Sequence, residues 1–223
     1  MTYRELYLKL LEYAPMEISD RFVEEGAYDN SGMILETKKE IKTAVFCLDL
    51  TSASVNYAVS VGADAIVTHH PAIYRPVKNL LAGAPLLAAA NAGIGVISNH
   101  LNLDGAKEGI DYWLAAGLGG KIDKITDDFG NGEGYGRVGV FDKSFGEIIE
   151  NYKKEFGTEK AWAYGDVDKH ITKAASFCGA GLGDEEVEAA VKIGAELVVS
   201  ADIPHHVLLH AIESGLCVLS CTH

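Results

Sequence analysis

Histidines and aspartates stand where short apolar runs of this sequence end. His69 and His70 follow the run ADAIVT, and His100 follows IGVISN with Asp104 four residues later. Imidazole and carboxylate groups together are ligands that suit zinc, iron or manganese. These residue types at these places predict a metal site, provided that the fold brings the ends of the runs together.

The adjacent pair His69-His70 sets a condition on such a site. Neighbouring side chains on an extended strand point to opposite faces, so two adjacent ring nitrogens cannot easily share one partner there. If both histidines do chemistry, either they lie past the end of the strand or each of them serves its own ion.

Two further groups of the same kind come late in the chain. Asp202 follows the run ELVVSA, and His223 follows LCVLSCT. Taken singly, each candidate has an ordinary explanation: a histidine after a strand is usually a loop residue, and Asp104 or Asp202 can simply cap a following helix. Their shared place at strand ends is what favours a common site.

The other histidines are weaker candidates. His206 and His210 stand four apart on one face of an expected helix, with His205 just before them, but the sequence offers no third ligand nearby. His170 lies in a charged context and is expected to face solvent. The glycine-rich NGEGYG lacks the Lys-Ser/Thr of a phosphate-binding loop, and no GxSxG nucleophile motif occurs.

Alternating strands and helices must position these residues. A strand is expected to end at Asp49, with further strands at 63–68 and 94–98. Helices are expected to end at Gly62 and Gly93, and a third spans 106–119 with Ile110, Trp113 and Leu114 on its apolar face. Strand, helix and strand with short glycine-marked joints predict an α/β fold with largely parallel pairing.

Residues 121–142 break this rhythm, since they are rich in glycine and acidic residues. We interpret them as a linker, or as a loop leading into an exposed strand. A helix, SFGEIIENYKKEF, and a strand pair, AWAYGDV and ITKAASF, come next. The expected division is therefore a first α/β half at 1–120, a linker at 121–142 and a second half at 143–223, together forming one structural unit.

The second half repeats the first. AVSVGADAIVTHH (58–70) matches AVKIGAELVVSAD (190–202), AVFC (44–47) matches ASFC (175–178), and NAGIGVISNH (91–100) matches ESGLCVLSCTH (213–223). Three matches in one order indicate a duplicated unit. Because open α/β sheets bind ligands at the carboxyl ends of their strands, the two halves can converge on one site.

Composition narrows the class of protein. With 32 acidic against 19 basic residues the formal net charge is −13, which argues against nucleic acid as a general partner. No apolar run approaches the roughly 20 residues of a membrane span, and the N-terminal stretch lacks a signal-peptide core, so we expect a cytoplasmic protein with no membrane association. The four cysteines show no CxxC pair and are expected to be buried thiols.

Several stretches together resemble one known family. They are YDNSG (28–32), CLDLT (47–51), GADAIVTHHPAIYRPVKNL (62–80), SNHLNLD (98–104) and SADIPHHVLLHAIESGLCVLSCTH (200–223). The sequence is similar over nearly its whole length to the bacterial short form of the NGG-interacting-factor-like family, whose members are called GTP cyclohydrolase 1 type 2 homologues.

The resemblance implies two interlocked, duplicated α/β units around a central cavity that binds two divalent metal ions, and a ring-shaped homohexamer. His69 and His70 match the family's paired ligands, each directed to a different ion, Asp104 matches a carboxylate ligand and His223 a C-terminal histidine ligand. His100 matches a histidine that lines the site. His206 matches a motif histidine outside the ligand set.

One departure from the family concerns the end of the chain. The family follows its last histidine with three residues and a glutamate, whereas this sequence ends at His223. A bridging carboxylate would reduce the repulsion between two ions about 3.5–4 Å apart, so we expect the natural chain to continue beyond His223.

Two functions fit these patterns. The first is a metal-dependent hydrolase that acts on a small nucleotide-like or phosphorylated compound, with a metal-activated water as nucleophile and His100 as a proton shuttle. The second is a metal-binding assembly or regulatory protein without turnover. Histidine and aspartate ligands accept zinc, iron and manganese, so the sequence specifies neither the metal nor the substrate.

Overall fold

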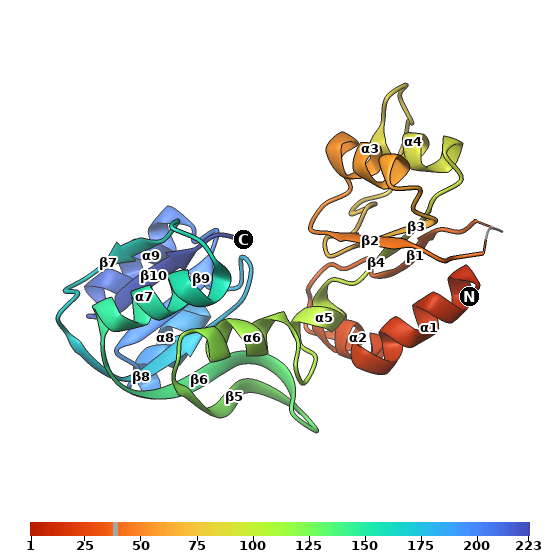
Figure 1. Cartoon of the computed structure of the whole chain (residues 1–223). Helices are drawn as coiled ribbons and strands as arrows, with labels where there is room; N and C mark the ends of the chain where they lie inside the picture. Colours follow the sequence, from red (N-terminus) through yellow and green to blue (C-terminus); the bar gives the residue numbers. More distant parts are fainter. Residues whose placement is uncertain (38–39) are drawn as a thin grey trace. The chain divides into compact units, whose positions relative to one another are not determined.

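The computed structural model describes residues 1–37 and 40–223 (Figure 1). The chain divides into two units with their own sheets, Met1–Ala106 and Lys107–His223. Each unit is a mixed α/β fold with helices on both faces of its sheet. The predicted α/β class is confirmed, while a cavity shared by the two units stays a prediction.

The sheet of the first unit has four strands. Their order is β1 (Gly32–Leu35), β4 (Gly95–Ser98), β3 (Ala65–Thr68) and β2 (Ala44–Cys47). Strands β2, β3 and β4 run parallel, and β1 is antiparallel to β4. The carboxyl ends of three neighbouring strands therefore lie at one edge of the sheet.

Helices cover both faces of this sheet. Ile66 and Val96 face α3 (Ser52–Ser60) and α4 (Pro85–Asn91), whereas Ala65, Val67 and Ile97 pack against Tyr3 and its neighbours on α1 (Tyr3–Tyr13). Alternate residues of one strand thus serve two cores, as the two-residue period of a strand requires. Helix α2 (Met16–Glu24) and the short α5 (Leu101–Asp104) complete the unit.

Local signals explain where these helices begin and end. Thr51 caps α3 and forms a capping box with Ser54. Gly62 and Gly93 follow α3 and α4 with φ of +67° and +68°, a left-handed conformation that glycine adopts without steric cost. Pro85 occupies the first turn of α4, where its missing N–H does no harm.

The sheet of the second unit has six strands. Their order is β5 (Lys121–Gly130), β6 (Glu133–Ser144), β8 (His170–Ser176), β9 (Leu197–Ala201), β10 (Cys217–Cys221) and β7 (Trp162–Tyr164). Strands β8, β9 and β10 are parallel, and the others pair antiparallel.

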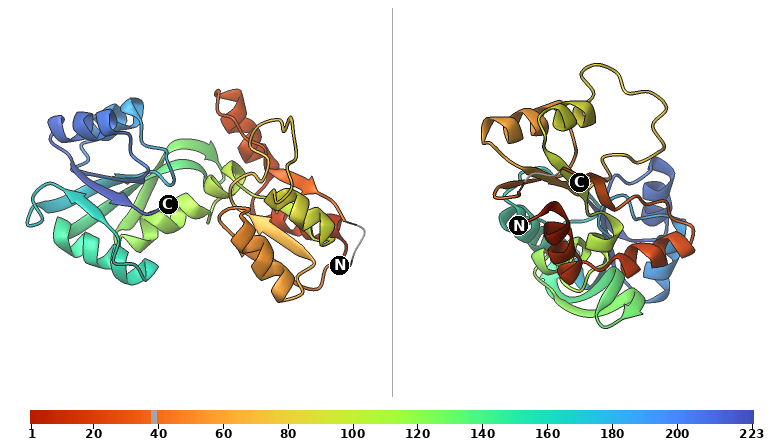
Figure 2. Two further views of the ribbon diagram at one scale, coloured as in Figure 1. Left: turned by 90° about the horizontal axis from the view of Figure 1, so that it is seen from above. Right: turned by 90° about the vertical axis from the view of Figure 1, so that its right-hand side faces the viewer.

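Two layers of helices cover this second sheet. Phe145, Ile148 and Tyr152 of α7 (Phe145–Phe156) pack on one face, beside α6 (Ile110–Gly117). Helices α8 (Asp184–Lys192) and α9 (His205–Glu213) cover the other face. Figure 2 shows these two blue helices on the opposite side of the sheet from the teal α7.

The strand order confirms the duplication. In each unit three parallel strands are followed by one antiparallel edge strand, β2-β3-β4-β1 in the first and β8-β9-β10-β7 in the second. Thr68 pairs with Ser98 as Ser200 pairs with Ser220. By this register His100 corresponds to Thr222 rather than to His223, so the match of the last strands is offset by one residue at its end.

Equivalent carboxylates reinforce the duplicated strands. Asp64 accepts hydrogen bonds from the N–H groups of Lys42 and Thr43, and Glu196 accepts from those of Thr172 and Lys173. Each of the two acids precedes the middle one of the three parallel strands in its sheet and accepts hydrogen bonds from backbone N–H groups at the start of the neighbouring strand. The duplication therefore extends to individual hydrogen bonds.

The structure differs from the expected linker over 121–142. These residues form the antiparallel strands β5 and β6, joined at Asn131 and Gly132. Both turn residues have positive φ, +58° and +85°, as a two-residue hairpin turn of the primed types needs. The hairpin extends the second sheet, and the division between units falls at residues 106–107 instead of 120.

Two smaller expectations are also corrected. The helix expected at 106–119 is α6, which starts at Ile110, and its Trp113 is 52% exposed. Asp111 is buried instead, because it pairs with the buried Arg137 at 3.1 Å and accepts from the N–H of Cys178. The stretches AWAYGDV and ITKAASF form β7 and β8, which are not neighbours, since β7 pairs with β10.

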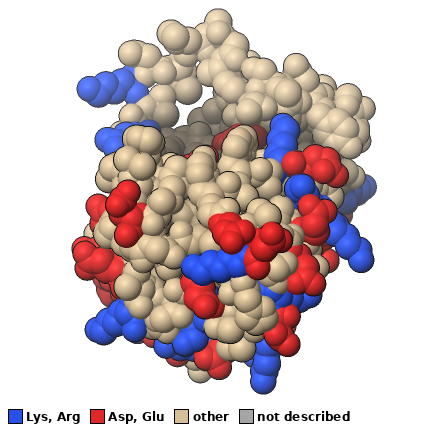
Figure 3. Space-filling model, turned by 90° about the vertical axis from the view of Figure 1, so that its left-hand side faces the viewer, with Lys and Arg blue, Asp and Glu red and all other residues tan. Residues whose placement is uncertain are grey.

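The surface and the thiols agree with the composition. Cys178, Cys217 and Cys221 are buried thiols, as predicted, and Cys47 is half-buried. Figure 3 shows acidic side chains interspersed with Lys and Arg over one face of the molecule. Among the described residues, no helix is both long and apolar enough to span a membrane.

Candidate metal site

His69 and His70 lie just past the end of β3. The N–H of His69 donates to the carbonyl of Cys47 and that of His70 to Leu48, while the Thr68 hydroxyl donates to the carbonyl of His70. The chain bends at these residues, so the alternation of an extended strand no longer applies. The two rings therefore come together, with centroids 5.0 Å apart.

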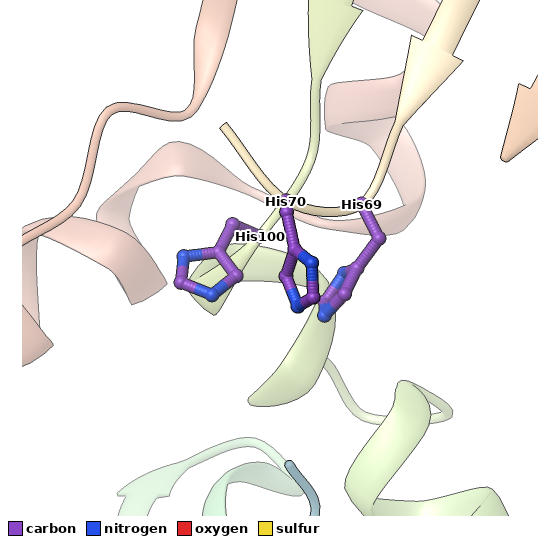
Figure 4. Close-up of side chains that lie close together, drawn as sticks. All are labelled: His69, His70 and His100. Atoms are coloured by element: carbon purple, nitrogen blue, oxygen red, sulfur yellow. The ribbon is translucent and has the colours of Figure 1, made fainter. Parts of the chain in front are cut away.

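His100 joins this pair from the end of β4. Its ring centroid lies 5.2 Å from that of His69 and 5.6 Å from that of His70. One ligand atom from each of the three residues lies within 4.8 Å of the others (Figure 4). Within residues 1–37 and 40–223 this is the one group of three or more His, Cys, Asp or Glu residues placed to hold an ion.

Each of the three rings has an acceptor at its Nδ1 atom. His69 Nδ1 is 3.0 Å from the carbonyl oxygen of Asn99, His70 Nδ1 is 2.8 Å from Asp49, and His100 Nδ1 is 2.8 Å from Asp29. A carbonyl or carboxylate oxygen can only accept, so the proton of each neutral ring sits on Nδ1. Nε2 is then the nitrogen that can ligate a metal, an arrangement common among metal-binding histidines.

Asp29 is the more deeply buried of the two carboxylate acceptors, with a side chain 1% exposed against 51% for Asp49. The Ser19 hydroxyl donates to its second oxygen at 2.5 Å. Burial by itself would raise the pKa of Asp29, but hydrogen bonds from His100, Ser19 and Ser31 outweigh it and lower the pKa to about 2. The carboxylate therefore stays ionised beside His100.

Asp104 lies beside His69 at the end of α5. Its Oδ1 is 3.6 Å from His69 Nε2, and both side chains are largely buried. Burial lowers the pKa of His69, although the nearby Asp104 acts in the opposite direction. His69 is thus neutral near pH 7, which is the form that ligates metals.

In the second unit, His223 is held in the same manner as His70. Its Nδ1 is 2.5 Å from Asp202, which stands directly after β9. Asp202 has φ of +44°, an unusual value for a residue other than glycine. A residue other than glycine often keeps such a left-handed backbone conformation where its side chain has a functional role.

Two of the four remaining histidines contact a single acid each. His210 Nδ1 lies 2.7 Å from Asp184, and His170 lies 3.2 Å from Asp142. His205 and His206 are exposed at the start of α9. Among the described residues none of these belongs to a group that could hold an ion, which agrees with their lower rank in the sequence.

The chemistry of the donors fits a divalent metal. Three imidazoles with oriented rings, together with one carboxylate, match the nitrogen and oxygen ligands of zinc, iron or manganese sites. The four are His69, His70, His100 and Asp104.

Sequence reasoning missed Asp29 and Asp49. Both lie within stretches that carry the family resemblance, YDNSG and CLDLT, but neither was given a role there. Asp49 follows β2, so its place at a strand end was a usable signal. Asp29 precedes β1 and had no such signal.

The fold and the oriented histidines define an α/β protein with a candidate metal centre at strand ends. The sequence profile described as Duf34/NIF3 (NGG1p interacting factor 3) matches residues 1–223. The chain belongs to this family.

Curated relatives agree with this assignment. The Protein NIF3 homolog of Schizosaccharomyces pombe is 30% identical over 217 residues, which cover 88% of this chain and 76% of the relative. A GTP cyclohydrolase 1 type 2 homolog of Methanocaldococcus jannaschii is 31% identical over 200 residues, with 87% and 80% covered.

Solved structures share the fold. Staphylococcus aureus hypothetical protein SA1388 superposes with a TM-score of 0.87 at 22% identity, over 100% of this chain and 86% of that one. Reduced HcgD from Methanocaldococcus jannaschii gives a TM-score of 0.81 at 28% identity, with 100% and 87% covered.

Proposed function

We propose that this protein binds two divalent metal ions and is a metal-dependent hydrolase of a small nucleotide-like or phosphorylated compound. The convergence of His69, His70 and His100, each with an acceptor on Nδ1, is the observation that supports the metal site most directly. The name GTP cyclohydrolase 1 type 2 homolog, which several relatives carry, supports a nucleotide-like substrate.

The proposed ligands are His69, His70, Asp104 and His223. His69 and His70 are directed to different ions, Asp104 adds negative charge beside His69, and His223 comes from the second unit. Asp49 and Asp202 hold the Nδ1 protons of His70 and His223, which fixes the orientation of both rings.

Metal ions bound here would lower the pKa of a water molecule toward neutrality and polarise the bond to be cleaved. The chain itself would supply the proton transfers. His100 carries its proton on Nδ1, held by Asp29, so its Nε2 has a lone pair that can accept a proton from an attacking water and later return it to the leaving group.

Elemental analysis of protein purified without chelator or nickel resin is the first test. We expect two equivalents of zinc, iron or manganese per chain, and a lower content in the variant His70→Ala. A panel of nucleotides, phosphoesters and cyclic amides then tests turnover on the metal-loaded protein, with His70→Ala as the control. Full metal content with no turnover across the panel contradicts the hydrolase proposal.

Full metal content without turnover would favour the second candidate, a metal-binding assembly or regulatory protein. The family description, an interacting factor, favours it as well. Turnover that disappears in His70→Ala would exclude it.

A further inference from the structure

The segment Tyr28–Gly32 lies along the candidate metal site and contacts it at several points. The Ser31 hydroxyl accepts a hydrogen bond from the N–H of His100, and the Asn30 side chain donates to the carbonyl of Ile73, just beyond the His69-His70 pair. Tyr28 packs edge-on against Tyr74, with ring centroids 4.9 Å apart. The segment therefore ties together the two stretches that carry the histidines.

Asp29 makes the central contact of this segment. Its two carboxylate oxygens are divided between partners, with Oδ1 at 2.8 Å from His100 Nδ1 and Oδ2 at 2.5 Å from the Ser19 hydroxyl. Its side chain is 1% exposed, so water does not compete for these bonds. A buried carboxylate is costly unless charged or polar donors surround it, and these donors fix both its position and its direction.

We infer that Asp29 is a positioning residue that keeps the proton of His100 on Nδ1 and leaves its Nε2 unprotonated within the group of His69, His70 and His100. This inference rests on the proposed function for its purpose, because Nε2 is the atom that would accept the proton. The test of the inference is independent of the proposed function, because the tautomer of His100 can be measured in metal-depleted protein.

The alternative is a purely structural role, in which the contact only joins the segment Tyr28–Gly32 to Ser19 of α2 and to His100. A structural role predicts a loss of stability when Asp29 is changed, with no particular effect on one ring. A positioning role predicts a change confined to the His100 ring, because Asn99 and Asp49 hold His69 and His70 independently.

The test is nitrogen NMR of the histidine side chains in the metal-depleted full chain at a pH where the rings are neutral. We expect the wild type to hold His100 mainly as the Nδ1–H tautomer. In Asp29→Ala, His100 should shift mainly to the Nε2–H tautomer, while His69 and His70 keep theirs. A wild-type His100 protonated on Nε2, or an unchanged His100 in folded Asp29→Ala, overturns the inference.

Asp64→Asn is the matched control. Asp64 is another largely buried carboxylate of the same unit, but it binds backbone N–H groups at the opposite end of β3 from His69. This variant should lose stability and leave all three histidine tautomers unchanged. An Asp64→Asn variant that shifts His100 as much as Asp29→Ala does would show that the effect is a general loosening and overturn the inference.

Asp29→Asn keeps the test decisive if the alanine variant does not fold. The amide oxygen is a weaker acceptor than a carboxylate, so the Nδ1–H proton of His100 should move upfield while those of His69 and His70 stay. No movement at His100 contradicts the inference. Zinc titration of the wild type reports separately on the proposed function: absence of binding would contradict that function without altering the tautomer result.

Discussion

A histidine at a strand end becomes a potential ligand only when something fixes its ring. His70 and His223 are each paired through Nδ1 with an aspartate, Asp49 and Asp202, and each of these aspartates follows a neighbouring strand. The same pairing thus occurs once in each unit. Loss of a second-sphere partner of this kind typically lowers metal affinity by about 10- to 100-fold, so the two aspartates contribute to the proposed metal site together with the histidines they hold.

Tyr3 provides a prediction about alkaline stability. It is fully buried against the first sheet, its hydroxyl donates to the carbonyl of Val96, and burial raises its pKa to about 12. A raised folded-state pKa gives stability that is complete below pH 10 and is lost as the pH rises toward 12, about 3 kcal/mol for a shift of two units.

Tyr3→Phe should therefore flatten this loss between pH 10 and 12, at the cost of about 1 kcal/mol at neutral pH for the missing hydrogen bond. Urea unfolding at successive pH values measures both effects. Tyr57→Phe is the control, because Tyr57 is 59% exposed and its substitution should leave the alkaline profile unchanged. Identical alkaline profiles for Tyr3→Phe and the wild type would contradict the prediction.

At the scale of elements, the duplicated joints set where the strands end. Gly62 and Gly194 follow equivalent helices with φ of +67° and +72°, and a Cβ at either position would meet nothing within 4 Å. A side chain at either position would therefore destabilise the protein through its unfavourable backbone conformation and not through clashes with neighbouring residues.

Gly62→Ala and Gly194→Ala should each lower the free energy of unfolding by about 1 kcal/mol, by similar amounts in the two units. Denaturant unfolding measures this loss. Asparagine tolerates left-handed backbone better, so Gly62→Asn and Gly194→Asn should cost less than the alanine variants. An alanine variant as stable as the wild type at either position would show that the joint can relax.

The sequence was a good guide to elements with local signals. The strands before His69 and His100 and the helices that end at Gly62 and Gly93 are where their patterns predicted them. Asn131-Gly132 was also a local hairpin signal, but the surrounding glycines and acids favoured a linker interpretation.

Long-range contacts were beyond such reasoning. Asp29 meets His100 across 71 residues, and no periodicity records that contact. Trp113 was expected on the apolar face of its helix, yet it is 52% exposed, whereas Asp111, which pairs with Arg137, is buried. The burial of Asp111 depends on Arg137, which lies on another element, so the local sequence around Asp111 does not predict it.

At the scale of the whole molecule, several large apolar side chains face outward. Phe46 on the edge strand β2 is 67% exposed, Leu81 is 73% exposed, and Trp162 on the edge strand β7 is 54% exposed. Apolar edge strands are commonly covered by association.

We therefore expect a homo-oligomer, and six times 23.9 kDa for the hexamer that the family resemblance implies. Light scattering coupled to size-exclusion chromatography measures the mass. Phe46→Glu should reduce it if β2 is part of the contact, with Asp142→Asn, a change at a fully exposed acid of the hairpin, as the control. A mass of 23.9 kDa at all concentrations contradicts self-association.

The division of the proposed ligands between the two units leads to a prediction about metal content. The first unit contains three of the four proposed ligands, His69, His70 and Asp104, and three protein ligands are enough to hold one ion. A second ion needs further ligands, and His223 of the second unit is the proposed source. His223→Ala in the full chain should therefore lower the metal content from two equivalents to one, without a change in the fold.

Elemental analysis and circular dichroism together measure this, and His170→Ala serves as the control because His170 is exposed and pairs only with Asp142 among the contacts described. The fragment 1–106 carries the complementary test, since both apolar clusters of the first unit lie within it. It should fold and bind one equivalent. Two equivalents bound by the fragment, or by His223→Ala, would mean that the first unit alone holds both ions and that the duplication serves the fold rather than a shared metal centre.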